Sequence, residues 1–159
     1  YTPVNETSPI LRHPVDKFDF NNPPINPVEL SNILIQSMID YRGIGLAAPQ
    51  LGLPYRVFVI HSNPTLVFFN PSIVDVSKEE IYLEEGCISF PGLIIKIKRP
   101  KSIKVRYTTP HGEIKTEKYT GMTARIIQHE LDHLNGVLYT KRANRYHLEK
   151  AQKDRKIGR

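Results

Sequence analysis

The sequence of 159 residues contains no tryptophan, only one cysteine and no long apolar run. A lone cysteine, Cys87, cannot form a disulfide within the chain, which is typical of a reducing compartment. No apolar run approaches the roughly 18 residues that cross a membrane. The first residues lack the basic start and apolar core of a signal peptide. These absences predict a cytoplasmic protein without membrane contact, with an organelle or a virus-infected host cytoplasm as the alternative.

Most of the chain also lacks an excess of either charge. The net charge is +6, and the eight basic and two acidic side chains of Lys141–Arg159 account for all of it. We therefore divide the chain into a domain of residues 1–144 and a short basic tail of residues 145–159. Such a tail can attract RNA through phosphate contacts, or it can be a solvated helix or a frayed end. The sequence does not separate these two interpretations.

The first half of the chain changes from a helical to a strand-like period. Residues 1–25, rich in proline and asparagine, predict an irregular arm. Asn26 as N-cap and Pro27 at the first helical position predict a helix that stops at Gly43. Short strands are then predicted at 57–60, 66–69, 72–76, 81–83, 94–97, 102–107 and 113–119. Turns rather than helices separate these strands, which predicts antiparallel sheet.

A second long helix is predicted from Met122 to Asn135, with Gly136 as its stop. Its apolar side chains occupy two nearly opposite arcs, and its polar ones are confined to the strip that remains. A helix that is apolar on two sides is buried on two sides. The predicted fold is therefore α+β, with antiparallel β-sheets wrapped around a central helix.

This central helix carries the sequence His-Glu-x-x-His. Residues four apart on a helix share one face, with Cβ atoms roughly 6 Å apart, so His129 and His133 can bind one metal ion. Glu130 is rotated by about 100° from His129, which places it beside the metal, where a base acting on bound water must lie. The alternative is a chance match on a solvated helix.

Two histidines leave a tetrahedral metal short of protein ligands. Downstream, only His147 and Glu149 could supply a third, and both lie in the basic tail without a supporting motif. Upstream, Cys87 follows a glycine at the end of a predicted strand, a good position for a thiolate. Thiolate and imidazole together suit zinc or ferrous iron, so the sequence favours Cys87.

Three segments, taken together, resemble the peptide deformylase family, in the same order along the chain. They are Gly43-x-Gly45-Leu46-Ala47-Ala48-Pro49-Gln50, Glu85-Gly86-Cys87-Ile88-Ser89 and Gln128-His129-Glu130-Leu131-Asp132-His133-Leu134-x-Gly136. The resemblance covers roughly residues 9 to 140. It implies an enzyme that hydrolyses the formyl group from the N-terminal formyl-methionine of newly synthesised polypeptides and releases formate.

The resemblance also implies the metal ligands and the reacting groups. Cys87, His129 and His133 would bind the metal, with water in the fourth position. Ferrous iron is the native ion expected, although zinc, nickel or cobalt can substitute. Glu130 would act as the base, while Gln50 and the backbone N–H of Ile88 would stabilise the oxyanion.

The substrate contacts implied by the resemblance are mostly backbone groups. Ile44, Gly45 and Gly86 would hold the peptide as an added strand. Met122 and Ile126 lie on the histidine arc of the helix, so we expect them to line the methionine pocket; packing in the core is the other interpretation.

Some residues depart from the family pattern. Ile88 replaces the usual leucine, and Leu93-Ile94-Ile95-Lys96 replaces a stretch that often carries an arginine and a glutamate. The tail is shorter than in many bacterial members, whose C-terminal helix helps to dock the ribosome.

The expected partners are a formyl-methionyl peptide and, through the tail, the ribosome. We expect a monomer that binds no specific DNA and no membrane. Two other functions compete with this one: a metallopeptidase that cuts internal peptide bonds, and a non-catalytic RNA- or ribosome-binding module that works through the tail.

Overall fold

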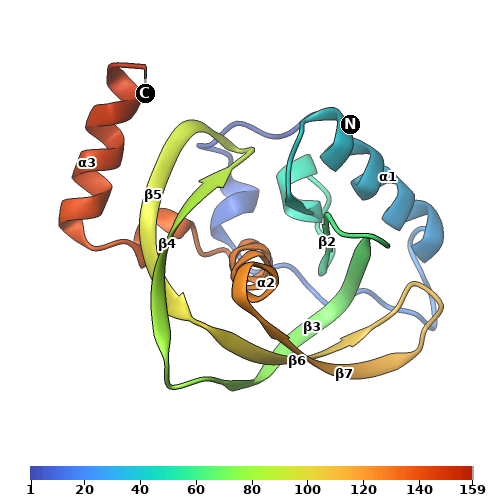
Figure 1. Cartoon of the computed structure of the whole chain (residues 1–159). Coiled ribbons are helices and arrows are strands. Elements are labelled where there is room, and N and C mark those ends of the chain that lie inside the picture. The colour runs from blue at the N-terminus through green and yellow to red at the C-terminus, as the bar shows by residue number, and fades with distance from the viewer. Residues whose placement is uncertain (159) are drawn as a thin grey trace.

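The computed structural model describes residues 1–158 and has the predicted α+β architecture, with strands arranged around a central helix (Figure 1). The helices are α1 (Pro27–Asp40), α2 (Gly121–Leu134) and α3 (Arg145–Lys156), with short 3₁₀ turns η1 (Pro9–Arg12), η2 (Ala48–Leu51) and η3 (Tyr139–Arg142). The strands are β1 (Gly45–Ala47), β2 (Val57–Ile60), β3 (Leu66–Val76), β4 (Glu80–Cys87), β5 (Phe90–Pro100), β6 (Ser102–Thr108) and β7 (Ile114–Thr120).

The strands form two separate antiparallel sheets. Within residues 1–158, the larger sheet has the order β1-β2-β3-β6-β7, and β4 pairs only with β5. Because β3 pairs directly with β6, the β4–β5 hairpin is an excursion from the larger sheet. Figure 1 shows α2 nearly end-on, between this hairpin and the larger sheet.

The start of α1 is as predicted, but its end differs. The Asn26 side chain accepts hydrogen bonds from the backbone N–H groups of Val28 and Glu29. We expected Gly43 to supply the left-handed stop; instead Arg42 takes this conformation, with φ of 54°. A large side chain thus occupies a backbone position that usually favours glycine.

Several strand boundaries also differ from the prediction. The segments 66–69 and 72–76 join into β3, whose pairing with β6 shifts register between Phe69 and Ser72. A bulge of this kind interrupts the alternation on which the prediction rests. The small-residue segment 43–50 was not predicted as a strand, but it contains β1, because Gly45–Ala47 pairs with β2, and most of η2.

The central helix α2 is buried on more sides than its apolar arcs require. Ile127 and Leu134 pack with the aromatic core of the larger sheet. The predicted polar strip consists of Arg125, Gln128, Asp132 and Asn135. The first three are buried as well and form hydrogen bonds with the β4–β5 hairpin, whereas Asn135 is exposed. Most of the polar strip is therefore an internal contact.

The basic tail forms α3, which packs outside β5 (Figure 1). Ala151 is buried in the cluster that also contains Leu93 and Ile95 of β5. Arg155 forms an ion pair of 3.0 Å with Glu6 of the N-terminal arm. Within residues 1–158, no helix is both long and apolar enough to span a membrane.

Candidate metal centre

Three side chains predicted as metal ligands converge between the hairpin and α2. Cys87 is the last residue of β4, while His129 and His133 lie one turn apart on α2. One potential ligand atom from each lies within 4.8 Å of the others. The Cys87 Sγ and the His133 Nε2 are 3.3 Å apart. This arrangement of one sulfur and two nitrogens matches the tripod of a catalytic metal site.

Glu85 fixes the orientation of His129. Its Oε1 lies 2.8 Å from His129 Nδ1, so the other ring nitrogen can face the cluster. Burial opposes a charge on His129, but hydrogen bonds with Cys87 and Glu85 outweigh it and raise its pKa. A proton on this imidazole is thus stabilised by its surroundings.

His133 differs from His129 in its surroundings. It is 1% exposed, and burial is the main reason why its pKa lies well below the ordinary value. The imidazole is therefore neutral, which is the form that binds metals.

Glu85 itself is held by two buried arginines. Arg99 donates to both of its oxygens, and Arg125 donates to Oε2 at 2.8 Å. Burial would raise the pKa of Glu85, but the hydrogen bonds from His129 and Arg99 keep it well below the usual range. Arg99 also donates to Asp132 of α2, at 2.9 Å. The network keeps Glu85 ionised and links both sides of the site.

Sequence reasoning missed this network, although one signal was available. Arg99 continues the inward-facing alternation of Ile95 and Ile97 along β5. A charged residue in an apolar register needs buried partners, and Glu85 and Asp132 supply them.

Gln50 points its amide at the tip of the hairpin. Its Oε1 accepts a hydrogen bond of 2.9 Å from the backbone N–H of Ala47. Its Nε2 lies 3.1 Å from Ser89 Oγ and 3.4 Å from Cys87 Sγ. The first bond fixes the amide orientation, so the NH₂ group faces the cluster. Ser89, 3% exposed, was not singled out from the sequence.

Glu130 is buried beside the metal ligands, where it faces β1. It is 4% exposed, and burial is the main reason why its pKa is raised to about 7. A Cβ atom on Gly45 would lie 2.8 Å from Glu130 Oε2 and 2.9 Å from Ile126 Cγ2. Only glycine lets the strand backbone approach the carboxylate this closely.

These residues line a cavity of about 240 Å³. Its wall consists of Arg42, Gly43, Ile44, Gly45, Gln50, Gly86, Cys87, Ile88, His129 and Glu130. Eight of the eleven residues predicted for the site are included. His133 belongs to the metal-ligand cluster but not to the cavity wall, and Ile126 lies close to Gly45 of the wall. Met122 is not part of its wall and is 53% exposed.

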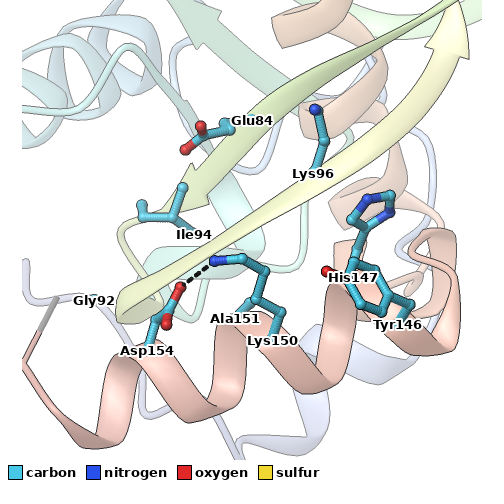
Figure 2. A pocket seen from close by; sticks show the side chains of 9 residues that line it. All are labelled: Glu84, Gly92, Ile94, Lys96, Tyr146, His147, Lys150, Ala151 and Asp154. Carbon is cyan, nitrogen blue, oxygen red and sulfur yellow. Dashed lines mark hydrogen bonds and ion pairs between the residues drawn. The ribbon is translucent and has the colours of Figure 1, made fainter.

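A larger cavity, of about 440 Å³, lies between the hairpin and α3 and contains none of the metal-ligand cluster. Figure 2 shows Lys150 and Asp154 paired along α3, with Glu84 and Lys96 on the facing strands. Its charges are of both signs, and none of the eleven residues predicted for the site belongs to its wall. Size alone therefore does not identify the site, and the smaller cavity holds the chemistry.

The other candidates for the third metal ligand lie elsewhere. His147 stacks edge-on with Tyr82 and Tyr146 beside the larger cavity. Glu149 forms an exposed pair with Arg145. Cys87 is thus the residue placed to complete the tripod, and its soft thiolate with two imidazoles suits a transition metal. A buried carboxylate beside such a tripod defines the class of metal-dependent hydrolases.

Comparison with known proteins identifies the family within this class. The family model for polypeptide deformylase matches residues 4–149. The peptide deformylase of Thermotoga maritima is 43% identical over 134 residues, covering 82% of this chain and 79% of that protein. The peptide deformylase of Synechocystis is 36% identical over 141 residues, covering 85% and 74%.

Solved structures agree with this result. The crystal structure of peptide deformylase from Thermotoga maritima superposes with a TM-score of 0.81 at 40% identity, covering 91% of this chain and 97% of that one. The Synechococcus elongatus peptide deformylase in complex with actinonin gives 0.89 at 32% identity, covering 97% and 86%. The chain belongs to the polypeptide deformylase family. It is a metal-dependent hydrolase that removes the N-formyl group from newly synthesised polypeptides.

Proposed function

We propose that Cys87, His129 and His133 bind one divalent metal ion and that the surrounding groups act on a formyl-methionyl peptide. The convergence of these three ligands beside buried Glu130 carries the proposal. When bound, such an ion polarises a carbonyl oxygen and lowers the pKa of water. Glu85 holds His129 in the ligand orientation through the 2.8 Å contact to Nδ1.

Glu130 moves the proton in this reaction. Burial raises its pKa to about 7, so near neutral pH the carboxyl group can both accept and release a proton. It takes the proton from the attacking water and passes it to the amine of the leaving peptide. The products are formate and a free amino terminus.

The negative charge that develops on the formyl oxygen needs hydrogen-bond donors. Gln50 supplies its side-chain amide, which the contact with Ala47 orients toward the cluster. The backbone N–H of Ile88, at the tip of the hairpin, supplies the second donor. Both residues line the cavity, so the oxyanion can lie between them.

The peptide binds as an extended strand in the cavity. Backbone groups of Ile44 and Gly45 flank it on one side and Gly86 on the other. Ile126 contributes to the methionine pocket because its side chain lies close to Gly45, beside Glu130. We also assign Met122 to the outer edge of that pocket, because it lies one helical turn before Ile126 on the same face of α2 and its side chain is exposed.

Ferrous iron is the native ion that we propose, with zinc, nickel or cobalt as substitutes, because a thiolate and two imidazoles suit these metals. We assign catalysis to residues 1–144 and propose a cytoplasmic monomer. The basic residues 145–159 would attract ribosomal RNA near the emerging chain. The exposed Lys153 and Lys156 support this role because phosphate contacts need accessible cations.

The decisive experiment measures formate release from formyl-Met-Ala-Ser under anaerobic conditions. We expect turnover that stops on chelation of the metal and returns when ferrous iron is added. A metallopeptidase would instead cut internal bonds of unformylated peptides, and a non-catalytic RNA-binding module would release no formate. Either result would overturn the proposal.

A further inference from the structure

Arg42 occupies a strained position at the rim of the candidate site. It directly follows the cap of α1, and its N–H donates to Ile39 O at 3.1 Å while the N–H of Gly43 donates to Met38 O at 2.9 Å. This pair of hydrogen bonds requires a left-handed residue after the helix cap, where glycine is strongly preferred. Arg42 adopts it with φ of 54°. Unfavourable backbone conformations of this kind often occur at functional sites.

The side chain of Arg42 carries a charge that no neighbour neutralises. Among residues 1–158, its guanidinium makes no side-chain hydrogen bond or ion pair. The adjacent acid, Asp40, instead accepts a hydrogen bond from Gln36. The Arg42 side chain is exposed and lines the cavity. It is therefore available to an incoming ligand.

The side chains near the other side of the cavity are apolar, or are an acid and a base opposite each other in the hairpin. Ile44 is 60% exposed, and Ile94, which lies against Gly86, is 48% exposed. The acid nearest to Gly86 along the exposed face of β4 is Glu84, which faces Lys96 across the hairpin. Among residues 1–158, Arg42 is thus the one lysine or arginine that lines the cavity.

The position of Arg42 along the peptide path follows from chain geometry. Glu130, where the formyl group reacts, lies next to Gly45, and Arg42 is three residues before Gly45. The chain turns at Arg42, which is left-handed, so these three residues span at most roughly 10 Å. A bound peptide that rises about 3.3 Å per residue places the two residues after methionine within this distance of the formyl group.

We propose that Arg42 selects substrates by binding a carboxylate within the two residues that follow formyl-methionine. Arginine binds carboxylates through a two-pronged pair of hydrogen bonds. The inference deepens the proposed deformylase function and rests on it. Acidic residues at these positions raise kcat/KM, and lysine at the same positions lowers it.

The test compares formyl-Met-Ala-Glu-amide, formyl-Met-Ala-Lys-amide and the two peptides with Glu or Lys directly after methionine. We expect the parent enzyme to favour glutamate over lysine about three- to tenfold in kcat/KM at one or both positions. High salt should reduce this ratio. Arg42→Glu should invert it, whereas Arg106→Glu on the exposed face of β6 should not change it.

The Arg42→Gly variant shows whether a change in substrate preference is independent of the stability of the fold. Glycine suits the left-handed position, so this variant should melt at or above the parent temperature while its glutamate-to-lysine ratio falls to about one. A parent ratio near one, or a ratio that Arg42→Glu leaves unchanged, would overturn the inference. The inference would also be overturned if substitutions of Arg42 changed kcat/KM for formyl-Met-Ala-Ser with a free C-terminal carboxylate but not for the amides. Arg42 would then bind the C-terminus of the peptide and not a side chain. Failure of all peptides to release formate would instead overturn the proposed function.

Discussion

At the scale of single residues, neighbouring side chains on α2 have different roles in the site. His129 and His133 present nitrogens to the cluster, and Glu130 lies beside them without being needed as a ligand. The carboxylate is close to the β1 backbone because Gly45 has no Cβ. Binding and proton transfer can therefore be separated by substitution.

Replacing Glu130 by glutamine should remove the proton acceptor while keeping shape and hydrogen bonding. We expect formate release to fall by about 10²–10⁴-fold, which corresponds to roughly 3–5 kcal/mol of barrier. Metal content should stay near that of the parent because the three ligands are unchanged. Metal stoichiometry and formate release must be measured on the same sample. A metal-loaded variant that reacts at the parent rate would refute the base assignment.

Cys87→Ser should cause a large loss of metal, because a hydroxyl is a poor substitute for a soft thiolate. The fold should persist, since the buried cores of both sheets are not altered. Metal analysis and circular dichroism on the same preparation provide the check. Ser89→Ala, which alters the neighbouring hydroxyl but no ligand, is the matched control. Full metal content in Cys87→Ser would show that another residue completes the tripod.

At the scale of elements, the β4–β5 hairpin is joined to α2 by ionic and backbone hydrogen bonds in addition to apolar packing. Arg125 of α2 donates to Glu85 of β4, to Ile97 O of β5 at 2.8 Å and to Ile81 O at 2.7 Å. One side chain therefore connects the helix with both strands. Its removal would leave a buried carboxylate and two carbonyl groups with fewer donors.

Arg125→Met should lower the free energy of unfolding by about 3–5 kcal/mol, as expected when one partner of a buried ion pair is lost. Arg106→Met, on the exposed face of β6, should change it by less than about 0.5 kcal/mol. Urea denaturation of the two variants tests this contrast. Equal stabilities would mean that the apolar contacts alone hold the hairpin against α2.

At the scale of the whole molecule, removal of α3 would expose the cluster around Ala151 and break the contact of Arg155 with Glu6. Charge substitution is a cleaner test of ribosome attraction. Lys153→Glu combined with Lys156→Glu should weaken co-sedimentation with ribosomes at low salt and leave turnover of a short formyl-peptide unchanged. Lys78→Glu with Lys115→Glu, on other exposed segments, is the control. Identical co-sedimentation of both variants and the parent would remove the docking hypothesis.

The sequence predicted the main elements of the fold because their signals are local. The Asn26 cap, the strand alternation and the two-sided burial of the central helix can each be read within one segment. The bulge in β3 could not be predicted, because it depends on pairing with the distant strand β6. The left-handed stop was predicted one residue too late, at Gly43 instead of Arg42, because glycine is the residue that usually takes this conformation.

The same distinction applies to the site. His129, Glu130 and His133 share one helix, so their spacing is enough to group them. Cys87 was favoured by the chemistry of its thiolate and assigned through the resemblance to a family, because no spacing rule connects β4 with α2. The partners of Glu85 come from separate elements, and no spacing rule connects Arg99 with Arg125.

The hairpin that carries Cys87 at its end acts mechanically as a lever. With eight residues in β4 and about 3.3 Å per residue, its arm is ~26 Å long, so a tilt of ~1° at the base would move the tip by ~0.5 Å. That displacement is comparable to the tolerance of a catalytic arrangement. The α3 packing and the Arg99 and Arg125 contacts brace the arm. Substitutions far from the cavity, at the base near Ser77 and Lys101, can therefore misalign the tip through leverage alone.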